Sequence, residues 1–108
     1  MKNTEFILRT CHVTSRYRGY RYLVDAVDLV SNQPDVDFRI TKDIYPALAL
    51  KHHTTSYCIE HNIRTVVKRC WSCNRSYVET VLGYKPPQCP SNMEFINSIA
   101  YILENTAS

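Results

Sequence analysis

The sequence predicts an all-α protein of about six helices around one core, and three observations favour this class. The chain has 108 residues, enough for a single domain spanning positions 1–108. Only 2 glycines accompany 5 prolines, which leaves few residues suited to the tight turns of an all-β fold. Several stretches repeat apolar residues at intervals of three and four, the period of a helix that buries one face.

Caps and apolar spacing predict the first two helices. Residues 3–12 would form a short helix that Asn3 caps and that turns Phe6 and Ile7 inward. Residues 18–31 place five side chains on one buried stripe. These are Tyr20, Leu23, Val24, Val27 and Val30. The alternation in "RYRGYRY" also suits a strand, but the continuous helical phase that follows outweighs it.

The stretch "SNQPDVDF" interrupts the periodicity and predicts a loop. A third helix follows over residues 41–51, with four side chains directed inward. They are Ile44, Tyr45, Leu48 and Leu50. Pro46 lacks the N–H that an interior helical position donates, so we expect this helix to kink or to begin late.

The stretch "HHTTSYCIEHNIRTVVKRCW" predicts the fourth helix, capped by Thr54 or Thr55 and ending near Cys73. Its core face repeats with helical period over several turns. That face consists of Ile59, Ile63, Val66, Val67, Cys70 and Trp71. Only about three residues separate this helix from the third, and so short a link between two amphipathic helices predicts a helix-turn-helix.

Capping boxes predict the last two helices, because a Ser followed three residues later by Glu satisfies two helix-terminal N–H groups. Ser76 and Glu79 would open a short fifth helix that Gly83 terminates. Ser91 and Glu94 would open the sixth, which runs to about position 104. Its inward residues are predicted to be Phe95, Ile96, Ile99, Ile102 and Leu103.

The overall charge is mildly basic, which permits an anionic partner without demanding one. The formal net charge is +3 and the isoelectric point is near 8.6. No apolar run could span a bilayer, and the first residues lack the apolar stretch of a signal peptide. We therefore expect a cytoplasmic protein with no membrane partner. In that reducing compartment the 5 cysteines are expected to stay thiols and to fill the core.

The polar side of the fourth helix carries residue types that suit DNA recognition. At about 100° per residue, its four central side chains project within roughly 60° of one another. They are Tyr57, His61, Arg64 and Lys68, with Glu60 and Thr65 on the flanks. An α-helix fits the major groove, where Arg pairs with guanine and Glu accepts from cytosine. The alternative interpretation is a solvated face, since every surface helix carries charges.

Basic residues around this helix favour the DNA interpretation, because they are placed to hold phosphates on both sides of a groove. Arg16, Arg18 and Arg21 crowd the second helix, and His52 precedes the turn. We predict base contacts from Tyr57, Glu60, His61 and Arg64. We predict phosphate contacts from Lys51, His53, Thr54, Thr55, Lys68 and Arg69.

Five blocks of the chain, in order and with similar spacing, resemble one known family. The blocks are "GYRYLVDAV" (19–27), "ITKDIYPALA" (40–49), "TTSYCIEHNIRTVVKRCW" (54–71), "LGY" (82–84) and "PSNMEFI" (90–96). They look like the C-terminal effector domain of the sporulation response regulator, stage 0 sporulation protein A, of endospore-forming bacteria. The likeness covers nearly the whole chain, and five colinear blocks make it far more specific than any one of them.

The resemblance implies a response-regulator effector domain of six helices that binds double-stranded operator DNA and activates or represses transcription in sporulation. It carries base contacts over to Glu60 and Arg64, whereas His61 and Cys58 stand where the family has Arg. Histidine lacks the planar fork that holds guanine through two hydrogen bonds. Because one such contact supplies about 1 to 3 kcal/mol of discrimination, we expect the operator preference to be shifted or weakened.

The resemblance also bears on assembly and regulation. The family's full-length protein has an N-terminal receiver domain, for which this chain has no room, so the chain is either an excised domain or works without phosphorylation. The family's last helix pairs copies on tandem sites, which makes the helix from about Asn92 a candidate for homodimer contacts after its core packing is accounted for. RNA polymerase is a further partner that a transcription regulator implies.

Other chemistry has weaker support in the sequence. Cys70 and Cys73 form a CxxC pair, to which Cys58, Cys89, His52, His53 and His61 offer further ligands. Structural zinc sites usually show two such pairs, and only one is present. No phosphate loop, nucleophile elbow or paired-carboxylate motif appears. We therefore expect no metal, no cofactor and no enzymatic activity.

Two hypotheses for function remain. The leading one is a DNA-binding transcriptional regulator that reads operator DNA in the major groove with residues 55–73. The alternative is a protein-interaction module that keeps the fold but pairs with a full-length regulator or another partner, which the loss of Arg at the position of His61 favours.

Overall fold

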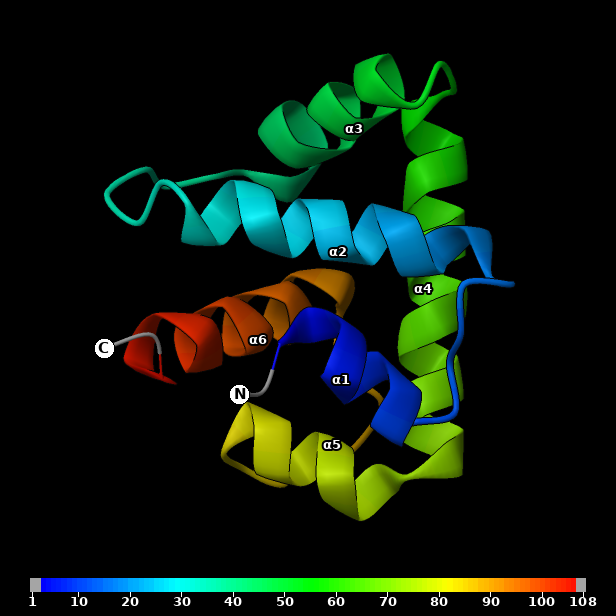
Figure 1. The fold of residues 1–108 in the computed structure, drawn as a ribbon, viewed down its shortest axis with the longest axis vertical. Helices are drawn as coiled ribbons and strands as arrows, with labels where there is room; N and C mark the ends of the chain where they lie inside the picture. The colour runs from blue at the N-terminus through cyan, green and yellow to red at the C-terminus, as the bar shows by residue number, and fades with distance from the viewer. Residues whose placement is uncertain (1–2, 107–108) are drawn as a thin grey trace.

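The computed structural model describes residues 3–106, which form six α-helices and one π-helical turn, with no strand in that range (Figure 1). The helices are α1 (Thr4–Thr10), α2 (Arg18–Ser31), α3 (Tyr45–Lys51), α4 (Ser56–Cys73), α5 (Arg75–Leu82) and α6 (Asn92–Thr106), and the π turn η1 (Ile40–Ile44) leads directly into α3. The predicted all-α class is confirmed.

Caps define several helix ends as predicted. Asn3 accepts from the N–H of Phe6 at 2.8 Å, and Thr55 accepts from the N–H of Cys58 at 3.1 Å. Ser91 and Glu94 form the complete capping box, with each side chain accepting from the other residue's N–H at 3.1 Å. These contacts satisfy N–H groups that have no partner within the helix.

The capping box predicted for the fifth helix is wrong. α5 begins at Arg75 with Asn74 as its N-cap, two residues before the predicted cap, so Ser76 already lies in the first turn. Asn74 also ends α4, and its side-chain N–H donates to the carbonyl of Thr10 at 3.4 Å. This contact with a residue 64 positions away fixes the bend at Asn74, and no local cap signal could reveal it. Gly83 ends α5 with φ of 85°, as predicted.

Two residues predicted to face the core are exposed instead. Phe6 is 48% exposed and Leu50 is 81% exposed. Both lie on helices of only seven residues, which contact the core along a narrow side. Leu50 follows Leu48 by two residues, so it points about 200° away from that buried side chain. The third helix also begins late, because the segment before Pro46 adopts the π turn.

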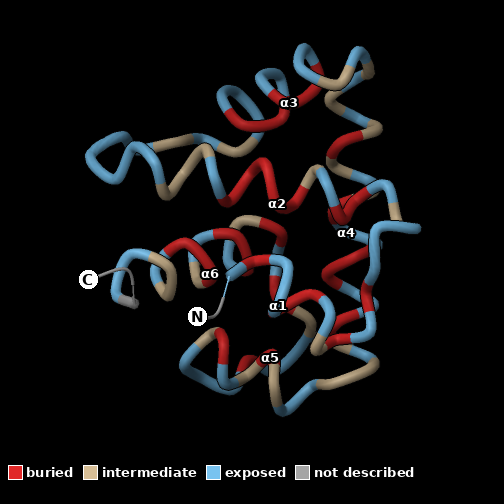
Figure 2. The backbone as a smooth tube through the Cα atoms, in the orientation of Figure 1, coloured by how far each residue is buried: buried red, intermediate tan, exposed pale blue. Residues whose placement is uncertain are grey.

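α2 lies at the centre of the fold and packs against both α4 and α6. Its apolar stripe meets the buried residues of the other helices, and the buried positions face inward along every helix (Figure 2). Four residues predicted to lie in the core are only partly buried at the margin of the core. They are Val30, Trp71, Ile102 and Leu103. No helix in residues 3–106 is both long and apolar enough to cross a membrane.

Gly19 permits the close approach of α2 to α4. A Cβ atom at this position would lie 2.1 Å from the carbonyl oxygen of Asn62 and 2.7 Å from a methyl group of Val66. Such distances are impossible for real side chains, so only glycine allows the first turn of α2 to cross α4 here. This crossing determines which sides of α4 stay open to solvent.

Candidate nucleic-acid interface

α4 separates an apolar face from a polar one along its 18 residues. Ile59, Ile63, Val66, Val67 and Cys70 are buried, as predicted from their spacing. On the opposite side, Tyr57, His61, Arg64 and Lys68 are all exposed, and we call these four residues the polar edge. The predicted division of this helix is confirmed, and the polar edge is open to a partner.

Two contacts organise the polar edge. The rings of Tyr57 and His61 stack with a centroid distance of 6.0 Å and an angle of 9° between their planes. One turn further on, the guanidinium of Arg64 donates to the half-buried carboxylate of Glu60 at 2.7 Å. Side chains four apart on a helix are neighbours, so each pair joins successive turns. The edge therefore presents a flat aromatic pair followed by an oriented guanidinium.

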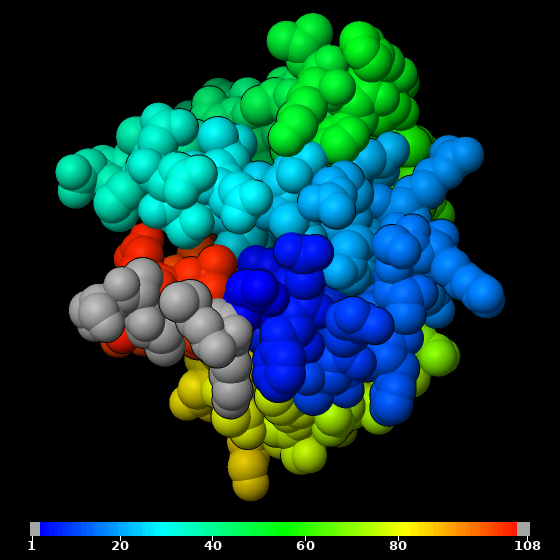
Figure 3. Space-filling model, in the orientation of Figure 1, coloured from blue at the N-terminus to red at the C-terminus, as the bar shows by residue number. Residues whose placement is uncertain are grey.

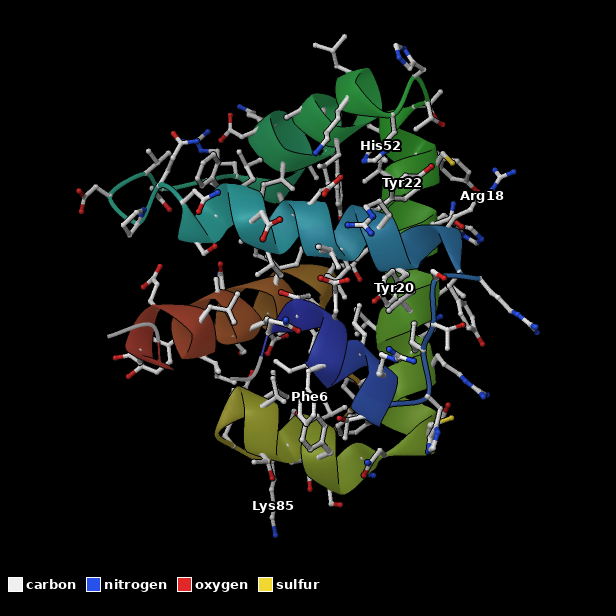
Figure 4. The ribbon with its side chains drawn as sticks, viewed as in Figure 1. Phe6, Arg18, Tyr20, Tyr22, His52 and Lys85 are labelled. Carbon is white, nitrogen blue, oxygen red and sulfur yellow. The ribbon has the colours of Figure 1, made fainter. Side chains whose placement is uncertain are left out.

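Different elements border the polar edge on its two sides. Towards α2, the crossing at Gly19 brings the start of that helix, with the exposed Arg16 and Arg18, near α4. Arg21 lies about 200° around α2 from Gly19, so it points away from α4. The start of α2, drawn in blue, projects beside α4 (Figure 3), and Arg18 points into solvent there (Figure 4). This side carries positive charge suited to phosphate.

Towards α6, the polar edge borders a groove of about 460 Å³. Its lining combines polar side chains of α4 with apolar residues of η1, of the segment before α6 and of the first turn of α6. They include Glu60, Arg64, Lys68, Ile40, Pro90 and Met93. Asn92 closes the base of this region, since its amide donates to the Tyr45 hydroxyl at 2.9 Å and to the Glu60 carbonyl at 3.3 Å. Burial raises the pKa of Tyr45, which keeps its hydroxyl protonated.

The residues predicted to hold phosphate divide into two groups. His53, Lys68 and Arg69 are exposed. Three others have structural contacts. The ammonium of Lys51 pairs with Asp25 at 3.2 Å, the Thr55 hydroxyl caps α4, and Thr54 is half-buried at the turn. The Thr54 N–H donates to the Ala49 carbonyl, so any backbone contact with phosphate here would involve the N–H groups that follow Thr55 at the start of α4.

Asp25 is the residue of this region that sequence reasoning missed. It lies on the buried side of α2 and is 8% exposed. Besides Lys51 it accepts from the Nε2–H of His52 at 2.7 Å. An acidic residue among the core positions Leu23, Val24, Ala26 and Val27 was the available signal, because a buried carboxylate requires a partner.

The cysteines do not assemble a metal site. Within residues 3–106, no group of three or more His, Cys, Asp or Glu side chains is arranged to hold a metal ion. Cys70 is buried in the core, where the neighbouring Cys11 thiol and desolvation raise its pKa. Trp71, beside it, is half-buried under Arg75, whose guanidinium lies 4.4 Å from the ring centroid.

Comparison with protein families agrees with the resemblance of the five sequence blocks. The family model described as "Sporulation initiation factor Spo0A C terminal" matches residues 4–103, nearly the whole chain. The match includes all of α1 to α5 and most of α6. This family comprises the DNA-binding effector domains of a sporulation regulator. The chain therefore belongs to the Spo0A C-terminal family, and α3 and α4 form the helix-turn-helix expected of such a domain.

Proposed function

We propose that this protein is a sequence-selective transcription regulator that inserts α4 into the major groove of operator DNA. The observation that carries the proposal is the exposed polar edge, bordered on its α2 side by Arg16 and Arg18. A helix enters the major groove with one face, and phosphates lie on either side of that face. The exposed cations and the polar edge match this arrangement.

Base reading is assigned to Tyr57, Glu60, His61 and Arg64. Arg64 reads guanine through two donors, and Glu60, its partner at 2.7 Å, accepts from a cytosine amino group nearby. The stacked Tyr57–His61 pair offers a flat surface that suits a thymine methyl group better than a bidentate guanine contact. The sequence that this protein prefers should therefore differ from one read by three arginines.

Phosphate binding is assigned to side chains and to the helix start. His53, Lys68 and Arg69 supply side-chain contacts, and Lys51 adds its charge from the end of α3. The N–H groups of Ser56 and Tyr57, which follow Thr55, have no carbonyl partner within α4 and lie at the positive end of the helix dipole. Arg16 and Arg18 serve the opposite strand of the groove.

Selection from a pool of random duplexes tests the proposal without assuming an operator. The selected duplex and a scrambled version would then be titrated by fluorescence anisotropy at several salt concentrations. We expect one enriched motif and an affinity that falls with salt, because each phosphate contact releases counterions and adds about 0.9 to the slope of log K against log salt. No enrichment, together with weak and salt-insensitive binding, would contradict the proposal.

A second candidate is a protein-interaction module that pairs with a full-length regulator. The exposed Leu50, beside the turn, and the exposed Tyr101, on α6, favour it because both are large apolar side chains on the surface. Size-exclusion chromatography with a sporulation regulator, in the absence of DNA, separates the two candidates. A stable mixed species would support this function, and separate elution at high concentration would remove it.

A further inference from the structure

A buried carboxylate joins α2 to the end of α3. Asp25 accepts at one oxygen, Oδ2, from Lys51 at 3.2 Å and from His52 at 2.7 Å. Lys51 is the last residue of α3, and His52 is its C-cap. The side chains of Asp25 and His52 are only 9% and 20% exposed. A carboxylate this buried is costly unless it is paired, so the contact holds α2 and the turn together.

The same histidine continues the contact towards α4. The rings of His52 and Tyr22 pack at 4.8 Å between centroids, and both lie where α2, α3 and α4 meet (Figure 4). The Tyr22 hydroxyl lies beside the thiol of Cys58, in the first turn of α4. We call Tyr22, Asp25, Lys51 and His52 the turn anchor. It contacts the chain on both sides of the turn between α3 and α4.

The turn itself requires such support. His53 has φ of 55°, a left-handed conformation that costs a non-glycine residue about 1 to 2 kcal/mol. The next residue, Thr54, donates its N–H to the Ala49 carbonyl at 2.9 Å. A strained residue persists only when its surroundings fix it. The neighbouring His52, held by Asp25, supplies one of those constraints.

From this arrangement we infer that Asp25 is a positioning residue for DNA reading, which fixes the direction of α4 through His52 and Lys51. The inference rests on the proposed function. At 1.5 Å per residue, α4 is about 27 Å long, so a rotation of roughly 10° at the turn would move its far end by about 5 Å. The same rotation would move Arg64 and Lys68, about 12 and 18 Å from the helix start, by about 2 and 3 Å, which is enough to break a hydrogen bond although neither residue touches Asp25.

The charge of Asp25 gives the inference a distinctive signature. The carboxylate neutralises part of the positive charge of Lys51, whose side chain is 61% exposed. Removing it frees that charge for attraction to any phosphate while it loosens the direction of α4. Binding to arbitrary DNA should therefore stay constant or tighten while binding to the selected sequence weakens. If the substitution only destabilised the fold, binding to arbitrary DNA and binding to the selected sequence would both weaken.

Asp25→Ala and Asp28→Ala form a matched pair, because both remove one negative charge from α2 and Asp28 is exposed. Dissociation constants would be measured for the duplex that the wild-type protein selects and for its scrambled version, at two salt concentrations. We expect Asp25→Ala to lower the ratio of the two affinities about tenfold, comparable to loss of one base contact, and Asp28→Ala to change it less than about twofold. Circular dichroism would confirm that both variants are folded at the assay temperature.

His52 variants keep the inference testable if Asp25→Ala fails to fold. His52→Gln retains a donor near the position of Nε2, whereas His52→Phe keeps a ring against Tyr22 but cannot donate to Asp25. We expect specificity to survive in His52→Gln and to fall about tenfold in His52→Phe. Equal affinity ratios in these two variants, or in the two aspartate variants, would overturn the inference and leave the proposed function intact. A wild-type protein that does not discriminate between duplexes would overturn both.

Discussion

Two carboxylate hydrogen bonds of the helix-turn-helix region have the same length but different surroundings. Asp25 meets His52 at 2.7 Å where both side chains are largely buried. Glu60 meets Arg64 at the same distance, but their side chains are 31% and 47% exposed. Solvent and salt screen the second pair, whereas the first is largely shielded from solvent. Burial, more than distance, therefore decides which pair stabilises the fold and which remains free to exchange its partner for DNA.

The difference in burial suits the different roles of the two pairs, which are support of the turn and contact with DNA. The buried pair belongs to the turn anchor, which has to keep one geometry whether or not DNA is present. The exposed pair belongs to the polar face of α4, where Arg64 has to leave Glu60 or share it with a base. A weak pair of this kind orients a guanidinium at small cost and does not compete strongly with guanine. The buried contact of Asp25 with His52 thus lies at the turn before α4, and the exchangeable contact of Glu60 with Arg64 lies on the exposed face of α4.

The largest expected effect is a loss of stability when the close crossing of α2 and α4, which positions both pairs, is disrupted. Gly19→Ala would place a Cβ 2.1 Å from the Asn62 carbonyl and should lower the free energy of unfolding by about 3 kcal/mol, the upper part of the usual range for overpacking. Gly83→Ala is the control, because it has φ of 85° but open space around it and should cost about 1 kcal/mol. Urea denaturation measures both. A smaller loss at position 19 than at position 83 would show that α2 and α4 separate easily.

Double-mutant cycles compare the two pairs directly. We expect a coupling free energy of about 2 kcal/mol between Asp25 and His52, because a charge-assisted hydrogen bond gains strength when buried. For Glu60 and Arg64 we expect about 0.3 to 0.5 kcal/mol, as for other exposed pairs four residues apart on a helix. Each cycle uses the two alanine variants and their combination in urea denaturation at pH 7. Equal coupling free energies for the two pairs would show that burial does not make the Asp25–His52 contact the stronger one.

DNA titrations sharpen the role of the exposed pair. Arg64→Ala should reduce discrimination between the selected and scrambled duplexes by about 1 kcal/mol, the low end for a base contact because freeing Arg64 from Glu60 also has a cost. Lys68→Ala should weaken binding to both duplexes alike and reduce the salt slope by about 1. Anisotropy titrations over a salt series separate these outcomes. Loss of discrimination in Lys68→Ala alone would reverse the assignment of the two residues.

The smallest effect concerns a third carboxylate, which is exposed and caps a helix. The pKa of Glu94 is lowered chiefly by a hydrogen bond from the Tyr84 hydroxyl, and then by the backbone N–H of Ser91. A lowered pKa means that the native state favours the charged form, so this stabilisation is present above the ordinary pKa of Glu and is lost as pH falls through the lowered value. Glu94→Ala should therefore lower stability at pH 7 by about 0.5 kcal/mol, the low end of capping effects.

That loss should shrink at acid pH, because the wild-type carboxylate becomes protonated there and stops favouring the folded state. Thermal melting of both proteins between neutral and acid pH measures the difference. Glu104→Ala, at another exposed position on α6, is the control for removal of one negative charge from this helix. A difference that grows on acidification would contradict the direction of the Glu94 pKa shift.

Local signals explain why so much of the secondary structure was predictable. The bounds of α2 match the expected residues 18–31, and Thr55 caps α4. The capping box at Ser91 and Glu94 forms as predicted. Caps and apolar periods act within a few residues, so they survive without knowledge of the rest of the chain. The same periodicity placed the polar edge on the exposed side of α4.

The predictions that failed required contacts distant in sequence. Leu50 is the exception, because it follows Leu48 by only two residues and the helical period alone directs it away from the core. Ser76 fits a capping box, yet the bend falls at Asn74 because Asn74 is held by Thr10. Residues far apart in the chain decide such cases, and their juxtaposition follows from packing of the whole domain.

The sequence by itself determined the helices, most of their caps and the polar composition of α4, because each depends on neighbours within one or two turns. Only the tertiary structure decided how α4 is held. The Gly19 crossing joins residues more than 40 positions apart, and the pair of Asp25 with His52 spans 27 positions. A carboxylate on α2 becomes a support for the turn only when folding removes water from it and brings a donor within reach, which is a property of the packed domain.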